Sequence, residues 1–265
     1  MSIPRPEAGR AALITGASSG IGDALARQLA ARGHDVILVA RRADRLEALA
    51  EQLRQQHGRR VEVLPCDLAD AAARADLLTD LDKLDLELDV LVLCAGFGLG
   101  GPFITEDPDR LTCLVRTNVE AVVALSRALI PPMAERRRGA VLFVSSMAGN
   151  QPMPHFGAYA ATKAAVTSLA EALHCELKQH HISVTALCPG GVTTEFSMVG
   201  GMEHVEKRTP SAVMIGPRAC AMAGLRALDS GKRVEIPRLG VKALAWFGAH
   251  APRALWLPLC RKMMT

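Results

Sequence analysis

Three polar side chains in the middle of the chain have the types and the spacing needed for proton transfer. Ser146 follows an apolar run, Tyr159 lies 13 residues later, and Lys163 lies 4 residues beyond Tyr159. Residues four apart share one face of a helix, so a helix here places the phenol beside the ammonium group. Reducing a carbonyl needs a proton donor beside the developing alkoxide, and oxidising an alcohol needs a base. The spacing therefore predicts a site in which Tyr159 is the general acid or base.

The charge of Lys163 is the expected means of lowering the Tyr159 pKa. A free tyrosine titrates near 10, so bringing its pKa to about 7 requires about 4 kcal/mol. A positive charge about 4 Å from the phenolate supplies roughly this amount at an effective dielectric constant of about 20. Ser146 could hydrogen-bond the substrate oxygen and share its charge. The alternative is that Tyr159 and Lys163 meet on a helix by chance, and the glycine-rich turn described next counts against it.

A glycine-rich turn near the N-terminus predicts a binding site for a dinucleotide diphosphate. Its sequence is Thr15-Gly16-Ala17-Ser18-Ser19-Gly20-Ile21-Gly22, and it opens directly into a helical stretch. Glycines let the backbone approach the diphosphate, and a helix start offers free N–H groups. Strand–helix turns also use glycine for structural reasons, so the context carries the prediction rather than the glycines alone. The expected cofactor contacts here are Gly16, Ser18, Ser19, Gly20, Ile21 and Gly22.

Two arginines after the second apolar run favour NADP(H) over NAD(H). An NAD site typically has an acidic residue at this point, whereas this chain has Arg41 and Arg42. A guanidinium can hydrogen-bond a 2′-phosphate, which a carboxylate would repel. The alternative is a solvated helix start, but the helix dipole opposes two arginines there.

The residues that follow the third and fourth apolar runs are suited to contact the adenosine part of a dinucleotide. Asp67, beside Leu68, could accept a hydrogen bond from the adenine amino group, or could merely cap the helix that follows. Ala95 and Gly96 are small enough for a cofactor to pass close to the backbone.

Short apolar runs that alternate with helical stretches must position these groups. The runs are residues 12–14, 36–39, 61–64, 90–93, 141–144 and 182–187. Near-continuous apolarity is typical of parallel strands covered on both faces, and the alternation predicts an α/β doubly wound parallel sheet. Ligands bind such sheets beyond the carboxyl ends of the strands, which is where the motifs fall. Because no stretch rich in Gly, Ser or Pro divides the chain, we expect one domain over residues 1–265.

Composition narrows the possible functions and the compartment. The net charge of +4 is mild and aromatic residues make up 3%, so nucleic-acid binding is disfavoured. The 7 cysteines form no Cys-x-x-Cys pair or zinc-like cluster, which indicates reduced thiols in a cytoplasmic protein without a metal. The N-terminus has no apolar run typical of a signal peptide.

Two segments in the last third of the chain are expected to lie outside the strand–helix alternation. Residues 195–211 are expected to form a lid over the substrate. Residues 239–265 are apolar but are interrupted by charged residues and prolines, so a membrane span is excluded. We expect a helical lid or packing extension there, and peripheral membrane contact is the less favoured alternative.

The motifs together resemble the short-chain dehydrogenase/reductase family over roughly residues 10–237. The family pattern Thr-Gly-x-x-x-Gly-x-Gly matches residues 15–22, and Tyr-x-x-x-Lys matches residues 159–163. The resemblance implies a Rossmann-like three-layer fold with about seven strands. It also implies a catalytic set of Asn118, Ser146, Tyr159 and Lys163. Asn118 would bend a helix and hold a water that relays protons to Lys163, and these two residues and Tyr159 would also contact the cofactor.

The resemblance also implies a loop that contacts the nicotinamide. The sequence departs from the family pattern at one position. The loop carries Pro189, Gly190, Val192 and Thr194, and Arg41 matches the position that favours NADP. Cys94 stands where the family has an asparagine, which puts the local hydrogen bonding in question. Members of the family are often homodimers or homotetramers, so an oligomer is expected.

The function expected from these residues is NADP(H)-dependent hydride transfer to a ketone or aldehyde, or from a secondary alcohol. Met153, His155, Phe156 and Phe97 could line an apolar pocket, which favours a bulky apolar substrate. The alternatives are a non-catalytic module that senses NADP(H) and a nucleotide-sugar epimerase or dehydratase. The intact proton-transfer set disfavours the first, and the glycine spacing disfavours the second.

Overall fold

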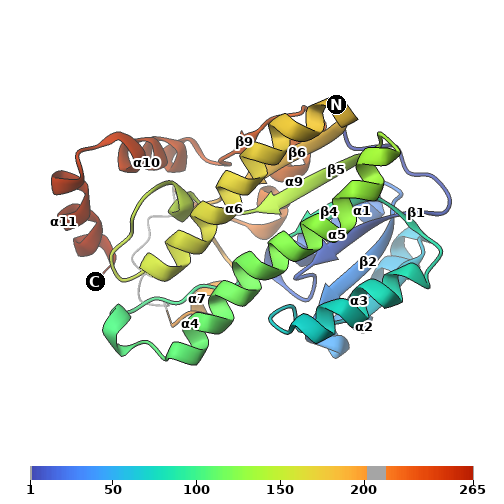
Figure 1. Ribbon diagram of the computed structural model, residues 1–265, viewed down its shortest axis with the longest axis horizontal. Coiled ribbons are helices and arrows are strands. Elements are labelled where there is room, and N and C mark those ends of the chain that lie inside the picture. Colours follow the sequence, from blue (N-terminus) through green and yellow to red (C-terminus); the bar gives the residue numbers. More distant parts are fainter. Residues whose placement is uncertain (1, 202–212, 265) are drawn as a thin grey trace.

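A seven-stranded parallel sheet forms the middle of the molecule (Figure 1). The computed structural model describes residues 2–201 and 213–264. The strand order is β3-β2-β1-β4-β5-β6-β9. The strands are β1 (Arg10–Thr15), β2 (Asp35–Ala40), β3 (Val61–Pro65), β4 (Glu87–Leu93), β5 (Gly139–Val144), β6 (Ile182–Leu187) and β9 (Val234–Glu235).

The strand interiors explain why the sheet is buried on both faces. Every residue of β5 and β6 is buried, including Ser183 and Thr185, whose hydroxyls donate to the carbonyls of Leu228 and Lys232. Strands covered on both sides need apolar or satisfied side chains at every position. The apolar runs of the sequence are therefore strands, as predicted, and among the strands of this sheet the two-residue β9 corresponds to no such run.

Helices cover the sheet in two layers, each with its own apolar cluster. One layer contains α1 (Gly20–Ala31), α2 (Ala43–His57) and α9 (Pro217–Asp229). The other contains α3 (Ala71–Asp82), α5 (Ala121–Glu135) and α6 (Gly157–Glu176). This arrangement confirms the predicted Rossmann-like fold of three layers.

Shorter elements lie mostly beyond the carboxyl ends of the strands. They are η1 (Phe103–Thr105), α4 (Pro108–Val115), η2 (Arg116–Glu120), η3 (Met147–Asn150), η4 (Leu177–His180) and α7 (Phe196–Val199). A separate pair of strands, β7 (Gly191–Val192) and β8 (Met214–Ile215), is also parallel. The order of the main sheet reverses between β1 and β4, which is the place where doubly wound sheets bind ligands.

The C-terminal residues form two helices, α10 (Leu239–His250) and α11 (Arg253–Met264), at one end of the molecule (Figure 1). The indole of the buried Trp256 donates to the Pro152 carbonyl at 3.1 Å, which fixes α11 against the loop after β5. Gly248 of α10 lies against the Gln151 side chain, and a Cβ there would come within 1.5 Å of its amide oxygen. In the part of the chain that the structure describes, no helix has the length and apolarity to cross a membrane.

Candidate active site

A cleft of about 980 Å³ runs along the carboxyl ends of the strands. Every residue predicted to contact the cofactor lines this cleft, with the exception of Asn118. Its walls come from the turns after β1, β2, β3, β4, β5 and β6 and from α10 and α11. Among the described residues no cluster of His, Cys, Asp and Glu has the geometry of a metal site.

The glycine-rich turn leaves open backbone where a diphosphate would lie. Gly16 has φ +70°, and a Cβ there would come within 2.9 Å of the Ala95 Cα. At Gly22 a Cβ would lie 2.2 Å from the Gly16 carbonyl oxygen, so a side chain is excluded. Ser19 precedes α1 but its side chain caps no N–H group of the helix. The free N–H groups of α1 therefore face the cleft and fit an anionic ligand.

The two arginines after β2 have different partners. The guanidinium of Arg42 donates to the hydroxyls of Ser18 and Ser19, the latter at 2.8 Å, and pairs with Glu195 at 2.9 Å. Arg45 of α2 pairs with the same carboxylate at 2.8 Å. The Arg41 side chain is 67% exposed and its guanidinium is 4.0 Å from the Asp67 carboxylate. Arg41 is therefore the more available of the two for a 2′-phosphate.

Side chains at the ends of β3 and β4 shape the next part of the cleft. The Asp67 carboxylate accepts a hydrogen bond from the N–H of Ala69 at 3.0 Å, while Asp70 caps α3. At β4 the Thr15 hydroxyl accepts from the N–H groups of Cys94 and Ala95 at 2.9 and 3.1 Å. Thr15 thus anchors the backbone at the position where the sequence departs from the family pattern.

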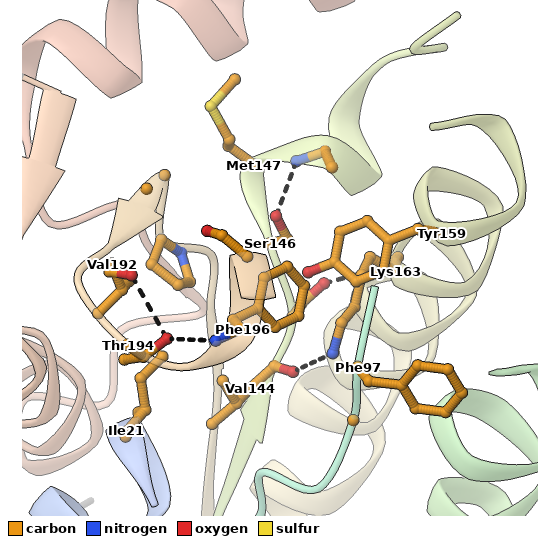
Figure 2. Close-up of a pocket in the computed structure, with 18 of the residues that line it drawn as sticks. Ile21, Phe97, Val144, Ser146, Met147, Tyr159, Lys163, Val192, Thr194 and Phe196 are labelled. Carbon is orange, nitrogen blue, oxygen red and sulfur yellow. Dashed lines mark hydrogen bonds between the residues drawn. The ribbon is translucent and has the colours of Figure 1, made fainter. Parts of the chain in front are cut away.

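Ser146, Tyr159 and Lys163 meet at the centre of the cleft, and all three are buried (Figure 2). Tyr159 points from α6 toward Ser146, which follows β5. Its ring stacks on Phe156 at 4.4 Å between centroids and meets the edge of Phe196 at 5.4 Å. The Lys163 ammonium group is 5.8 Å from the centroid of the Tyr159 ring and donates to the Val144 carbonyl at 2.9 Å.

The electrostatics of this cluster differ from the sequence-based expectation for Tyr159. Burial raises the pKa of the Tyr159 phenol above 10.0, and the hydrogen bond with Ser146 offsets this only in part. The predicted lowering of the Tyr159 pKa was therefore wrong for this structure, because the cost of burying the phenolate outweighs its favourable contacts. Burial also lowers the pKa of Lys163 to about 8. The phenol therefore carries its proton at neutral pH.

Asn118 is fully buried within the π-helical turn η2 and braces the wall behind Lys163. Its side-chain amide donates to the Phe97 carbonyl at 2.9 Å and to the Thr162 hydroxyl at 3.1 Å, and it accepts from the Phe97 N–H at 3.1 Å. A Cβ at Gly96 would lie 2.9 Å from the Asn118 amide oxygen and 3.3 Å from the Lys163 ammonium nitrogen. Asn118 therefore lies close to Lys163 and Gly96, but unlike these two residues it does not line the cleft.

Comparison with known proteins identifies this arrangement. A family model described as short chain dehydrogenase matches residues 10–202. The chain belongs to the short-chain dehydrogenase family.

Relatives and solved structures of the family resemble most of the chain. Dehydrogenase/reductase SDR family member 7B of Bos taurus is 33% identical over 243 residues, which are 86% of this chain and 75% of that protein. A short-chain dehydrogenase from Sphingobium yanoikuyae in complex with NADPH is 33% identical with a TM-score of 0.81, over 91% of this chain and 93% of that one. The bulky-bulky ketone specific alcohol dehydrogenase from Comamonas testosteroni is 28% identical with a TM-score of 0.76, over 92% and 98% of the two chains.

The loop after β6 forms the opposite wall in this short-chain dehydrogenase. The Thr194 hydroxyl accepts from the Phe196 N–H at 3.2 Å and lies 3.4 Å from the Val192 carbonyl (Figure 2). A Cβ at Gly20 would be 3.0 Å from the Thr194 methyl group, so this loop touches the glycine-rich turn. The Pro189 carbonyl accepts from the Met147 N–H at 2.9 Å, which joins the loop to the Ser146 side of the cleft.

The part of the cleft predicted to hold the substrate is mostly apolar. Met153, Phe156 and Phe97 line it as expected, whereas His155 is not among its described lining residues. Of the predicted lid, Glu195, Phe196 and Ser197 line the cleft, and residues 202–211 lie outside the described residues.

Several residues of the site were missed by reasoning from the sequence. Glu195 pairs with arginines about 150 positions away, a separation that no local pattern reveals. The C-terminal helices contribute further lining residues: Leu244, Trp256, Cys260, Lys262, Met263 and Met264. The only signal for them was the apolar character of residues 239–265.

Proposed function

We propose that this protein is an NADP(H)-dependent oxidoreductase that interconverts a bulky apolar ketone and its secondary alcohol, with Tyr159 as the general acid or base. The observation that carries the proposal is the buried cluster of Ser146, Tyr159 and Lys163 at the centre of the cleft. A module that only binds NADP(H) has no need of a phenol and an ammonium group at this point.

The cleft fits NADP(H) on the evidence of its own residues. The open backbone at Gly16 and Gly22 and the free start of α1 suit a diphosphate, and Arg41 suits a 2′-phosphate. The related Sphingobium yanoikuyae protein was solved in complex with NADPH, which supports this assignment. When bound, the cofactor supplies the hydride.

The chain's own residues supply the proton and hold the substrate oxygen. Ser146 and Tyr159 together present two hydroxyls to a carbonyl oxygen between them, so the carbonyl is polarised and oriented. Because burial raises the Tyr159 pKa, the phenol carries its proton at neutral pH and can donate it to the developing alkoxide. Lys163 stabilises the phenolate that remains.

The apolar wall suggests the substrate class. Phe156 and Phe196 flank the Tyr159 ring, and Met153 and Trp256 extend the same lining. Such a surface favours ketones with large apolar substituents. The similarity to the bulky-bulky ketone specific enzyme from Comamonas testosteroni supports this substrate class. We further propose a homodimer or homotetramer that pairs α5 and α6, where Val123 is an exposed apolar side chain.

Replacing the phenol tests the proposal. Tyr159→Phe should lower kcat for NADPH oxidation by about 10²-fold or more, the scale of losing a general acid, while the fluorescence-measured Kd for NADPH changes little. The assay uses a panel of ketones and aldehydes graded in size and polarity. Cys175→Ser, at an exposed cysteine outside the lining of the cleft, is the control and should leave kcat unchanged.

Two outcomes would contradict the proposal. Full turnover by Tyr159→Phe would exclude its role as acid. NADPH binding by the wild type without turnover on any member of the panel would favour a sensor of NADP(H) instead.

A further inference from the structure

The last 30 residues carry a charge unlike the rest of the chain. Residues 236–265 contain five basic side chains and no Asp or Glu, whereas residues 1–235 contain 26 basic and 27 acidic ones. The five are Arg238, Lys242, Arg253, Arg261 and Lys262. A protein that is nearly neutral over most of its length therefore ends in a strongly cationic segment.

The same segment exposes large apolar side chains. Of the twelve large hydrophobic side chains exposed among the described residues, seven belong to α10 and α11: Leu239, Trp246, Phe247, Leu255, Leu257, Leu259 and Met263. The Leu239 side chain is 82% exposed and Trp246 is 65% exposed. Meanwhile Val241, Ala245 and Trp256 face inward and are buried. Both helices are thus apolar on their outer surface as well as toward the protein.

Apolar and aromatic side chains mixed with lysines and arginines are typical of helices that lie in a membrane interface. Tryptophan prefers the headgroup level, and basic side chains gain about 1 kcal/mol each beside anionic lipid. We propose that α10 and α11 bind the surface of an anionic lipid bilayer, with Trp246 and the exposed leucines inserted at the headgroup boundary.

The position of α10 and α11 suggests what contact with a bilayer would do for the protein. Cys260 and Met264 of α11 line the cleft from its inner side, and Lys262 and Met263 also line it. Bilayer contact at α11 places the apolar end of the cleft next to the lipid phase. Delivery of an apolar substrate from the bilayer rests on the proposed function, whereas lipid binding itself does not.

A second copy of the chain is the other occupant to consider for this surface. A two-fold interface brings the same patch of each subunit together. Here it would place five cations against five cations with no carboxylate from either segment to pair them. An anionic bilayer presents negative charge to these cations, so the charge of the surface favours lipid over self-association.

Vesicle binding by the full-length protein tests the proposal. We expect sedimentation with mixed phosphatidylcholine–phosphatidylserine vesicles, little with pure phosphatidylcholine, and loss of binding as salt is raised. Both tryptophans of the chain are in these helices, and Trp256 is already buried. A blue shift of the fluorescence on binding therefore reports Trp246, and Trp246→Ser should abolish it.

Two variants and a control separate the contributions. Arg238→Glu/Lys242→Glu at the start of α10, where the helix dipole tolerates acids, should weaken binding at least tenfold. Leu239→Ser/Leu255→Ser should weaken binding to the mixed vesicles although it leaves every charge in place. Ile104→Ser removes a 92% exposed apolar side chain outside the extension and should change nothing.

Several results would overturn the proposal. One is failure of the wild type to bind the mixed vesicles. A second is binding of the Arg238→Glu/Lys242→Glu variant to these vesicles as tightly as the wild type. Another is a Leu239→Ser/Leu255→Ser variant that turns a dimer into a monomer and leaves vesicle binding intact, since a second copy would then cover the surface. Because vesicle binding requires no turnover, its failure is distinguishable from failure of the proposed enzyme activity.

Discussion

Arg41 and Arg42 are neighbours in the chain but have different surroundings. Arg42 is held by the hydroxyls of Ser18 and Ser19 and by Glu195, so it organises the glycine-rich turn. Arg41 is largely exposed, and its guanidinium lies 4.0 Å from the Asp67 carboxylate. A phosphate group at the mouth of the cleft would find Arg41 available and Arg42 already engaged.

This difference predicts distinct effects of two alanine substitutions. Arg41→Ala should raise the Kd for NADPH about tenfold or more and leave that for NADH nearly unchanged, because only NADPH has the 2′-phosphate. Arg42→Ala should weaken both cofactors, since it loosens the turn that receives the diphosphate. Titration of each variant with both dinucleotides measures this. Equal weakening of NADPH and NADH by Arg41→Ala would contradict the assignment.

Individual residues show where prediction from the sequence stops. The types and spacing of Ser146, Tyr159 and Lys163 were enough to predict that they meet, because a strand end and one helix face position them. The direction of the Tyr159 pKa was not predictable, since it depends on how completely the fold removes water from the phenol. The ion pairs of Glu195 depend on tertiary contacts that leave no local pattern.

At the scale of the elements, one buried carboxylate links three neighbouring strands near their amino-terminal ends. Asp89 of β4 is completely buried and pairs with Arg10 of β1 at 3.0 Å and with Arg138, just before β5, at 2.9 Å. Both arginine side chains keep partial contact with solvent, at 23% and 28% exposure. The carboxylate thus holds β1, β4 and the start of β5 in register at the edge opposite the cleft.

Removing this carboxylate should destabilise the protein without altering its site. Asp89→Ala should lower the free energy of unfolding by about 3 kcal/mol, because it leaves two cations facing a buried gap. Glu87→Gln, a neighbouring carboxylate with a 48% exposed side chain, should cost less than about 1 kcal/mol. Urea unfolding followed by circular dichroism measures both. Equal losses for the two variants would show that burial of Asp89 is unimportant.

The elements themselves were largely predictable. Six apolar runs became the six long strands, since a strand covered on both faces needs such a run. The short β9 was not predictable, because two paired residues leave no periodic signal. The division of the C-terminal segment into α10 and α11 follows from Pro252 at their junction, and its packing on Pro152 and Gln151 required the structure.

At the scale of the whole molecule, buried thiols give the fold a pH dependence. Burial raises the pKa from 9.0 to about 11 or about 12 in four cysteines: Cys66, Cys94, Cys188 and Cys220. Between pH 9 and 11 the unfolded chain therefore releases protons that the folded chain keeps, so stability falls as the pH rises. Lys163, with a pKa of about 8 instead of 10.5, acts in the opposite direction between those values. The four thiols and the Tyr159 phenol, whose pKa burial also raises, together outweigh this one ammonium group.

We therefore expect the free energy of unfolding to fall from pH 9 to pH 11. Cys220→Ala should flatten this dependence, because Cys220 is fully buried and its pKa is raised to about 12. Cys175→Ser, at an exposed cysteine, should leave the dependence unchanged. Urea titrations at stepped pH under reducing conditions provide the measurement. A slope identical in the wild type and Cys220→Ala would contradict the explanation.

Tyr159, packed between Phe156 and Phe196, is the one tyrosine of the chain. Ultraviolet difference absorbance of tyrosinate consequently has a single source in this protein. The ionisation of this phenol can therefore be followed at one oxygen atom without any label. The absorbance of this one phenol therefore reports directly on the oxygen atom at which proton exchange is expected.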